Sequence, residues 1–557
     1  MKTMVRNGFS RFAIIVLFVF VAYLHGITMP CSANENGPKN LILMIADGCG
    51  SEQYTLARWL KGSPLSFDSM LVGAVKTFNA SSVVTDSAPA ASAYATGHRT
   101  SDKFISMGPG ENTINGIQPT PPDMRHRPLA TILEGAKLKG MATGVVCTSR
   151  ITHATPAAFL AHTASRDLED DIMVQAVHQG ADLVMGGGLR HLLPGEKKSV
   201  RADGEDLSLI LARNGYRIVK TGTELETLKS GKVFGLFSSS HMEAELDRTV
   251  FEPEQPTLEQ MTEKAIEILS RHTAGFFLMV EGSQVDWACH ANDPAHLAGD
   301  LIMFDRAVGV ALRFAEKTGD TLLVVVSDHN TGGMTIGNRR TSVTYPRMTP
   351  EELIEPIRKM TLTASGIWRK AQGSRSRLEG LIEQYWGIKT EKAEMERIME
   401  LAEAYKKYPG TALGEVISAS RTAIGWSTQG HTGGDVPLFA FGPGSPRGLL
   451  DAQQLGNLMA SAIGIDLKAS TERLFVDAEA ALAGFKVWLD KGDGRNIALR
   501  AKTKDIEAEL PVNRNILKLG EKTVALEGIV IHAEATGKTY IPKQAIDIIK
   551  AASSPMQ

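Results

Sequence analysis

Cysteine is scarce in this sequence, which contains four in 557 residues. One of them, Cys31, falls in an N-terminal segment that we expect to be removed. The other three, Cys49, Cys147 and Cys289, are too few, and odd in number, to form the disulfide framework of a small exported protein. We expect buried free thiols, although an exposed one could pair between chains.

An excess of charge of one sign is also missing. The 60 basic and 62 acidic residues give a formal net charge of −2, so no basic field points to nucleic acid or to an anionic membrane surface. Hydrophobic residues make up 43% of the chain and charged residues 22%, which is ordinary for a soluble globular protein. The length allows two or more domains with a large core.

The one uninterrupted long apolar run lies at the N-terminus. It covers residues 12–24, follows a few basic residues, and falls short of the ~20 residues that a membrane-spanning helix needs. This pattern predicts a signal peptide over residues 1–33, with cleavage after Ala33. The mature protein would then be exported, to the periplasm or to the extracellular space or cell surface, with no membrane span after cleavage. There are two alternatives. One is a lipid anchor on Cys31, although the Met-Pro pair before this cysteine is unfavourable for lipidation, and the other is an N-terminal segment that stays uncleaved as an anchor.

Shorter apolar runs recur along the chain, and each ends in polar or glycine-rich residues. Amphipathic helical stretches lie between several of them. Near-continuous hydrophobic strands that alternate with helices predict an α/β fold with a mostly parallel central sheet and helices on both faces. In such sheets, ligands bind at the carboxyl ends of the strands. The runs cover residues 40–48, 142–149, 181–188, 275–282, 321–329 and 437–444.

Two parts of the chain depart from this alternation. Charged helical sequence replaces the strand pattern over about 334–424, which we interpret as a helical insertion, a cap or crown near the mouth of the site. A structural or oligomer-forming role for it is at least as well supported as contact with substrate. Residues 471–557 read as a small β-rich module without a cluster of metal ligands, and we assign it no chemistry. The catalytic domain is therefore expected over 34–470.

The segment "VVTDSAPAASAYATG", residues 83–97, places a serine at the start of a helix of small residues. The structural interpretation is a capped helix, with Asp86 as N-cap, Ser87 in the first turn and Pro89 tolerated there. The catalytic interpretation is a nucleophile, because a helix N-terminus offers free N–H groups and a positive dipole end to an anion. On these residues alone the structural interpretation is favoured.

Acidic residues and histidines gather at the ends of the predicted strands. Asp47 follows the first strand, and Glu281 ends the fourth. Asp286 and His290 are spaced i, i+4, which puts both on one face of a helical turn and suits a transition metal such as zinc. A surface helix with an ordinary Asp–His pair is the alternative. His431 stands in a glycine-rich loop before a buried strand, which favours exposure to a site.

The pair Asp328-His329 ends a strongly hydrophobic strand. Adjacent strand residues point to opposite faces, so both can ligate a metal only where the strand breaks into a turn, and Thr331 with the two following glycines provides that break. In "THATPAA", Pro156 biases Thr155 to an extended conformation, which would point Thr155 the same way as His153.

Arg166 offers a bidentate fork to a phosphate-like dianion. The alternative is a salt bridge on a helix surface with Asp167, Glu169 or Asp170. His162 we interpret as structural. The oxygen and nitrogen donors together would serve two transition metals and one magnesium; they are Asp47, Ser87, Thr155, Glu281, Asp286, His290, Asp328, His329 and His431.

In order along the chain, the motifs "ADG", "VTDSAPAASAYATGHRT", "HATPAAFLAH", "VMGGG", "FLMVEGSQVDWACHAND", "SDHNTGG" and "GHTGGDVPLFAFGPGS" resemble those of the alkaline phosphatase family over roughly residues 38–465. The resemblance implies an exported, metal-dependent enzyme that hydrolyses small phosphate monoesters through a phosphoserine at Ser87, with Arg166 clamping the phosphoryl oxygens. It also makes a homodimer an expectation.

The resemblance further implies two zinc ions, with cobalt as an alternative, and one magnesium. Asp286, His290 and His431 would hold the first zinc. Asp47 would bridge the second zinc and the magnesium; the remaining ligands implied for these two sites are Ser87, Asp328, His329, Thr155 and Glu281, with His153 beside the magnesium.

Two positions vary within the family, and here they are His153 and Trp287, where some members have aspartate and lysine. This exchange leaves metal preference and phosphate affinity open. A related phosphodiesterase, sulfatase or phosphonate hydrolase on the same scaffold is the alternative enzyme. Arg166 and the full ligand set argue against a diesterase, and the TDSA context argues against a sulfatase. A non-catalytic surface binding protein is the alternative outside enzymes.

Overall fold

The computed structural model describes residues 37–194, 201, 203–492, 494 and 496–553. The predicted signal peptide over 1–33 and Cys31 lie outside these residues. Cys49, Cys147 and Cys289 are buried free thiols, as the sequence predicts. No helix in the described ranges combines the length and the apolar character that crossing a bilayer requires.

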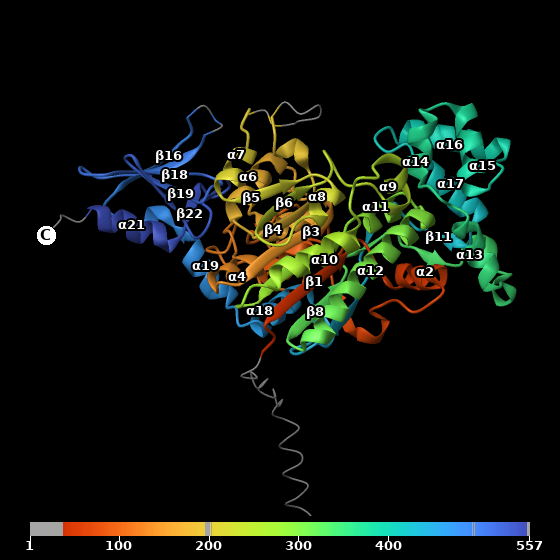
Figure 1. Ribbon diagram of the computed structural model, residues 1–557, viewed down its shortest axis with the longest axis horizontal. Helices are drawn as coiled ribbons and strands as arrows, with labels where there is room; N and C mark the ends of the chain where they lie inside the picture. Colours follow the sequence, from red (N-terminus) through yellow and green to blue (C-terminus); the bar gives the residue numbers. More distant parts are fainter. Residues whose placement is uncertain (1–36, 195–200, 202, 493, 495, 554–557) are drawn as a thin grey trace, which may run out of the picture. The chain divides into compact units, whose positions relative to one another are not determined.

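A ten-stranded sheet forms the centre of the structure, in the order β14-β2-β13-β8-β1-β7-β3-β4-β6-β5 (Figure 1). All neighbours pair in parallel except β13, which runs antiparallel to both β2 and β8. The strands are β1 Asn40–Ala46, β2 Leu71–Lys76, β3 Ala142–Arg150, β4 Leu183–Gly187, β5 Tyr216–Val219, β6 Lys232–Leu236, β7 Phe276–Gly282, β8 Thr321–Val326, β13 Val436–Phe441 and β14 Gly448–Asp451.

Helices cover both faces of this sheet, because its central strands are apolar on both sides. Strand β1 is buried along its whole length. Ile42 and Met44 pack in one hydrophobic core, and Leu41 and Leu43 pack in the other, as alternation along a strand requires. The first core includes α2 (Ser51–Lys61), α10 (Leu258–Leu269) and α12 (Pro294–Thr318), and the second includes α3 (Ser87–Thr96), α4 (Ile132–Leu138), α6 (Glu169–Gln179) and α18 (Ala452–Ala462). The predicted fold class is confirmed.

Five helices lie between two short paired strands, β10 (Thr335–Ile336) and β11 (Ile424–Gly425). They are drawn in the teal part of Figure 1. Two carboxylates anchor the insertion to the core: Asp247 of α9 (Glu245–Phe251) accepts hydrogen bonds from the Thr363 backbone and hydroxyl, and Asp293 accepts one from the Ala364 N–H. The five helices are α13 Pro350–Arg358, α14 Ala364–Ala371, α15 Arg375–Trp386, α16 Lys392–Ala404 and α17 Thr411–Arg421.

The C-terminal part is β-rich, as expected. A five-stranded antiparallel sheet packs one face on α21 (Lys543–Ser553), and a three-stranded sheet combines one strand that precedes it in the chain with two that follow it. The five strands are β16 Lys486–Asp490, β17 Ala498–Lys502, β18 Glu507–Pro511, β19 Ile516–Leu519 and β20 Lys522–Ala525, and the three are β15 Val476–Asp477, β21 Ile531–Ala533 and β22 Lys538–Ile541.

Candidate active site

Three adjacent strands end at the site, in the order β8, β1, β7. Asp47 directly follows β1, Glu281 lies at the end of β7, and β8 stops at Val326, two residues before Asp328. The chain therefore leaves the strand before the pair Asp328-His329, which frees both side chains to turn into the same space. All four of these side chains are 0–1% exposed.

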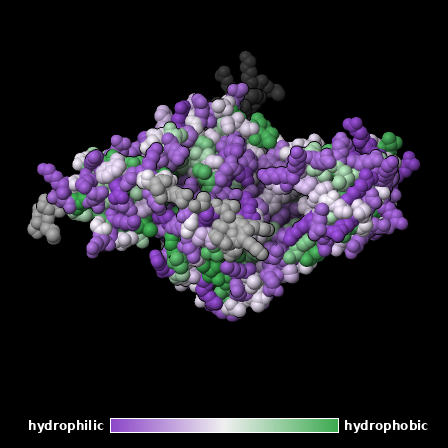
Figure 2. Space-filling view, turned by 90° about the horizontal axis from the view of Figure 1, so that it is seen from above, coloured by the Kyte–Doolittle hydropathy of each residue, from purple (hydrophilic) through white to green (hydrophobic). Residues whose placement is uncertain are grey.

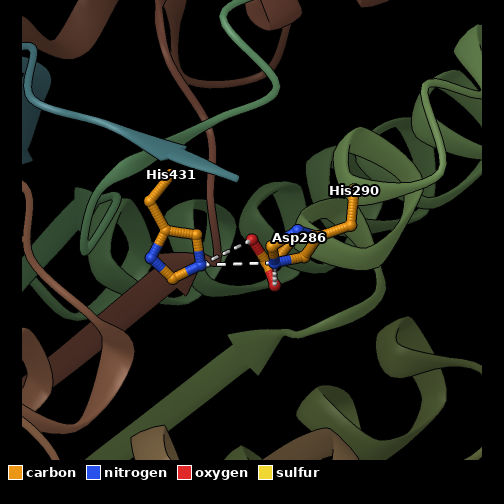
Figure 3. Close-up of side chains that lie close together, drawn as sticks. All are labelled: Asp286, His290 and His431. Carbon is orange, nitrogen blue, oxygen red and sulfur yellow. Dashed lines mark hydrogen bonds and ion pairs between the residues drawn. The ribbon is translucent and has the colours of Figure 1, made fainter. Parts of the chain in front are cut away.

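The first cluster of metal-ligand type consists of Asp286, His290 and His431 (Figure 3). Asp286 and His290 come from one short helix, α11 (Gln284–His290), and their Oδ2 and Nε2 atoms are 3.2 Å apart. His431 Nε2 lies 3.8 Å from Asp286 Oδ1 and 3.2 Å from His290 Nε2. The glycine-rich loop expected around His431 contains a two-residue strand, β12 (His431–Thr432), which pairs with Asn330–Thr331, and the Thr85 carbonyl 2.9 Å from His431 Nδ1 holds the imidazole.

Charge within this first cluster is mutually stabilised. Burial raises the pKa of the Asp286 carboxyl, but His290, His329 and His431 together outweigh burial and the net pKa is lowered. Burial lowers the pKa of His290, and Asp286 outweighs it, which raises that pKa to about 9. Thr331 adds a short hydrogen bond of 2.6 Å from its hydroxyl to Asp286 Oδ1. The sequence identified Thr331 only as part of a chain break, because a lone threonine carries no signal of such a contact.

A second cluster brings Asp47, Asp286 and His329 within ligand distance of one another. His329 Nε2 lies 3.7 Å from Asp47 Oδ1 and 3.2 Å from Asp328 Oδ2. The same nitrogen is 3.2 Å from the hydroxyl of Ser87. The nucleophile candidate thus touches the cluster directly.

The third cluster contains Asp47, His153 and Glu281. Thr155 lies nearby in sequence, but the extended conformation expected for it is wrong, since Thr155 belongs to helix α5 (Ala154–Leu160). Pro156 is tolerated there because the first turn of a helix leaves its N–H groups without intrahelical partners. His153 is the N-cap of this helix, so the helix start, rather than a strand, sets the positions of the two side chains.

Several donor atoms in these clusters are buried and have no hydrogen-bond partner among the described residues. Such atoms are rare in folded proteins because each loses its hydration without compensation. Cations between the clusters would satisfy them, so the residues fit the metal set implied by the sequence. The atoms are Asp47 Oδ1 and Oδ2, His153 Nδ1, Thr155 Oγ1, Glu281 Oε1 and Asp328 Oδ2.

The carboxylates of the second and third clusters repel one another when no cation is bound. Burial first, and then the charges of Asp328 and Asp286, raise the pKa of Asp47 well above its usual range. Burial raises the pKa of Glu281 to about 7. The protein therefore concentrates negative charge where only a cation or a proton can balance it, which is typical of a functional site.

Helix α3 begins at Ser87, and all ten of its residues are buried. Asp86 occupies the N-cap position, but its side chain makes no capping hydrogen bond, so the capping role expected for this carboxylate is wrong. Both of its oxygens accept from Arg166 Nη1 instead, at 2.6 and 2.7 Å. The first N–H groups of α3 therefore stay free of the Asp86 side chain.

Arg166 also contacts the third cluster, since its Nη2 lies 2.8 Å from His153 Nε2. The alternative of a local surface salt bridge is wrong, because each of the neighbouring acids has another partner. Asp167 pairs with Lys103, Glu169 with Arg150, and Asp170 with His191. Burial raises the pKa of Asp86, but Arg166 outweighs it and the pKa is lowered.

His162 is structural, as expected: its ring nitrogens lie 3.0 Å from the Ser106 carbonyl and 3.1 Å from Glu134 Oε1. His241 was missed. Its ring packs 4.2 Å from that of Trp287, centroid to centroid, and Trp287 in turn packs 5.4 Å from His153. Only the position of His241 shortly after β6 could have pointed to it.

The fold and the clustered donors define a class: an α/β enzyme with metal-binding clusters and a buried serine at the carboxyl ends of a parallel sheet. A family model described as alkaline phosphatase matches residues 38–465. The chain belongs to the alkaline phosphatase family. It is 34% identical over 458 residues to alkaline phosphatase 3 of Bacillus subtilis, which covers 78% of this chain and 91% of the relative. It is 31% identical over 503 residues to the Schizosaccharomyces pombe alkaline phosphatase, and the match covers 85% of this chain and 90% of that relative.

Solved structures of the family agree with this assignment. The alkaline phosphatase of Thermus thermophilus superposes with a TM-score of 0.68 at 27% identity, covering 78% of this chain and 94% of that one. The cold-active alkaline phosphatase from the psychrophile Shewanella sp. superposes with a TM-score of 0.63 at 30% identity, covering 76% of this chain and 99% of that one. The chain is therefore similar to phosphate-ester hydrolases in sequence and in fold.

Proposed function

We propose that this enzyme hydrolyses phosphate monoesters through a covalent phosphoserine on Ser87. The observation that carries the proposal is the contact between the Ser87 hydroxyl and His329, at 3.2 Å, inside a buried cluster of metal-ligand side chains. A phosphate monoester is a dianion, so the enzyme must supply positive charge where the ester binds. Arg166, the free N–H groups of α3 and bound cations are the sources of that charge.

The donor atoms of the three clusters favour different metals. Asp286, His290 and His431 suit zinc or cobalt, because these metals accept imidazole together with carboxylate. Asp47, Asp328 and His329, with Ser87, form a similar set for a second transition metal. The oxygens of Asp47, Thr155 and Glu281 suit magnesium. When bound, these cations lower the pKa of a coordinated hydroxyl or water and neutralise charge on the phosphoryl oxygens.

The third site contains His153, one of the two positions that vary within the family. A structural relative, the alkaline phosphatase of the Antarctic bacterium TAB5, superposes with a TM-score of 0.54–0.55 in two variants in which a histidine is replaced by aspartate or glutamate, each described with magnesium bound in the M3 site. These descriptions support a third metal site that holds magnesium when a carboxylate replaces the histidine. We propose that His153 has this role here.

The chain's own residues perform the displacement in two steps. The Ser87 oxygen attacks phosphorus, the bond from phosphorus to the ester oxygen breaks, and the alcohol leaves with a proton. Water then attacks the phosphoserine, the bond from phosphorus to Ser87 breaks, and inorganic phosphate leaves. Arg166 holds nonbridging oxygens in both steps, and Asp86 fixes the orientation of Arg166.

Rapid mixing with p-nitrophenyl phosphate tests this proposal. We expect a burst of p-nitrophenol equal to the enzyme concentration, and acid quenching should trap phosphate on Ser87. A rate on a phosphate diester or a sulfate ester that exceeds the monoester rate would favour the related hydrolases. Binding of the monoester without release of p-nitrophenol would favour a binding protein.

Two further parts of the proposal rest on sequence alone. Export rests on the N-terminal segment, and comparison of the mass of the mature protein with that of the full chain tests cleavage after Ala33. A homodimer rests on the family resemblance, and sedimentation of the purified enzyme tests it.

A further inference from the structure

A cavity of about 680 Å³ lies beside the metal-binding clusters, between the helical insertion and the core. None of the predicted metal ligands lines it. Its volume falls in the range of cavities that hold small organic ligands. Its walls come from α17, the β10–β11 pair and the segment before His431. The lining residues used below are Arg339, Tyr405, Glu415, Trp426 and Gln429. Figure 2 shows a hollow with hydrophilic walls beside the lobe in which Figure 1 draws these helices.

The cavity adjoins the first cluster through Trp426. A side chain built on Gly332 would begin 2.6 Å from the Trp426 ring and 3.0 Å from the carbonyl oxygen of Cys289. The indole thus packs on the backbone between Thr331, whose hydroxyl binds Asp286, and Gly333. Cys289 is the residue before His290. The aromatic wall and the first cluster are therefore separated by a single layer of backbone.

Hydrogen bonds also connect the part of the wall formed by Tyr405, Glu415 and Gln429 to the same cluster. The Tyr405 hydroxyl donates to Glu415 Oε2 at 2.8 Å, and the Gln429 amide donates to the same oxygen at 2.6 Å. The carbonyl of Gln429 accepts a hydrogen bond from His290 Nδ1. Because Tyr405 and Glu415 belong to the insertion, the insertion reaches a ligand of the first cluster through Gln429.

The distance from the cavity to the site is short along the chain. Gln429 precedes His431 by two residues and Trp426 precedes it by five. An extended chain spans at most ~3.6 Å per residue, so these walls lie within about 7 and 18 Å of His431. A phosphate ester whose alcohol part is the size of a nucleoside covers such a distance.

The walls have the chemistry of a site for a flat ring. Trp426 is fixed by a hydrogen bond of 2.8 Å from its Nε1 to Ser418 Oγ, which holds the ring in place. Arg339 is exposed, and its guanidinium can stack on a ring or donate to ring acceptors. Aromatic rings and guanidinium planes are the groups on which nucleobases stack.

We propose that this cavity is a subsite for the leaving group, and that it selects phosphate monoesters whose alcohol part carries a planar heteroaromatic ring, as nucleotides do. The proposal rests on the function proposed above. In an in-line displacement the ester oxygen departs opposite the attacking Ser87. Of the two donor sets proposed above for transition metals, Ser87 contacts the set that contains His329, and the other set is Asp286, His290 and His431. The alcohol part therefore leaves on the side of the first cluster, next to which Gln429 and Trp426 lie.

A matched pair of substrates tests this assignment on the full, metal-loaded enzyme. Adenosine 5′-monophosphate and ribose 5-phosphate release the same kind of primary alcohol and differ by the base. We expect kcat/KM for the nucleotide to exceed that for the sugar phosphate. Trp426→Ala should reduce this ratio by roughly fivefold to a hundredfold, the range that loss of one stacking partner gives. Arg339→Ala should reduce it by a smaller factor.

Controls separate the subsite from damage to the metal clusters. Trp59→Ala removes an exposed indole on α2 and should leave the ratio unchanged. Inhibition by inorganic phosphate, which has no alcohol part, should be the same in Trp426→Ala and wild type. If wild type has equal kcat/KM for both substrates, or if neither Trp426→Ala nor Arg339→Ala changes the ratio, the subsite is wrong while the phosphatase assignment stands. If wild type hydrolyses neither ester, the proposed function itself fails.

Discussion

Arg166 and Asp86 form an ion pair between residues 80 positions apart, with Arg166 Nη1 at 2.6 and 2.7 Å from the two carboxylate oxygens. The pair joins the loop after α5 to the residue that precedes Ser87. Asp86 therefore has two effects on a bound phosphate dianion. It orients the guanidinium, and its own negative charge opposes the dianion.

Two substitutions at Asp86 separate these effects. Asp86→Asn keeps an acceptor oxygen for Arg166 and removes the charge, so inorganic phosphate should inhibit roughly threefold to tenfold more strongly. Asp86→Ala removes the acceptor as well, so kcat/KM should fall by about tenfold or more as Arg166 loses its orientation. Steady-state kinetics with phosphate as inhibitor measures both. Identical behaviour of the two variants would show that charge and orientation are not separable in this pair.

Ser87→Ala should lower turnover by on the order of 10³-fold or more, because the nucleophile is lost. Metal content should stay close to that of wild type, since Asp47, Asp328 and His329 remain. Elemental analysis and acid-quench labelling check both points. Ser81→Ala, which changes an exposed serine six residues earlier, is the control. Near wild-type turnover in Ser87→Ala, without a trapped phosphoenzyme, would contradict the covalent mechanism.

His153→Asp should shift the third site toward magnesium. The substitution replaces a nitrogen donor by a carboxylate beside Asp47 and Glu281, and magnesium prefers oxygen ligands. Magnesium bound per chain, and the stabilisation of the fold against heat by added magnesium, should both rise. His272→Asp, on the exposed surface, is the control for an added carboxylate.

The double variant His153→Asp with Trp287→Lys adds a cation where Trp287 packs 5.4 Å from His153. Phosphate inhibition should tighten, and turnover should fall if release of phosphate limits the rate. Unchanged magnesium binding and unchanged phosphate inhibition would mean that neither side chain reaches the site.

The sequence predicted the central strands well, because strands buried on both faces are apolar throughout. Strand β1 and strand β8 were expected within two or three residues of their observed ends. Four strands of the same sheet, β2, β5, β6 and β14, were not identified. All four lie at or next to a sheet edge, and β2, β5 and β14 are partly exposed, so their hydrophobic pattern is weak.

The residues of the candidate site were likewise predicted where they lie at strand ends and missed where they make long-range contacts. Residues at strand ends, such as Asp47 and Asp328, were predicted because parallel strands bring their carboxyl ends together. The partners of Asp86 and the packing of His241 on Trp287 were not, since each contact joins segments far apart in the chain. The helix at Thr155 was missed because the restriction before proline was applied without the exception for a helix start.

The last prediction concerns His178, which joins helix α6 to the C-terminal module. Its Nδ1 lies 2.8 Å from Asn515 Oδ1, and Arg514 Nη1 lies 3.2 Å from its Nε2. A neutral ring satisfies both contacts, donating to Asn515 and accepting from Arg514. Burial first, and then the charge of Arg514, lower the pKa of His178 to about 4. A proton on Nε2 would face the guanidinium directly.

The sign of the pH dependence follows from these values. An unfolded histidine has a pKa of about 6.5, so between about pH 6.5 and 4 the unfolded state binds the extra proton. The contribution of His178 to the free energy of unfolding is thus complete above pH 6.5 and decreases as the pH falls, by about 2 kcal/mol at pH 5. His178→Gln, which cannot titrate, should lose this part of the pH dependence, whereas His272→Gln on the exposed surface should follow wild type. Denaturant unfolding at pH 7.5 and pH 5, followed by fluorescence, measures the difference. Equal losses of stability in His178→Gln and wild type would show that His178 is protonated in the folded protein and does not report on the contact between α6 and the module.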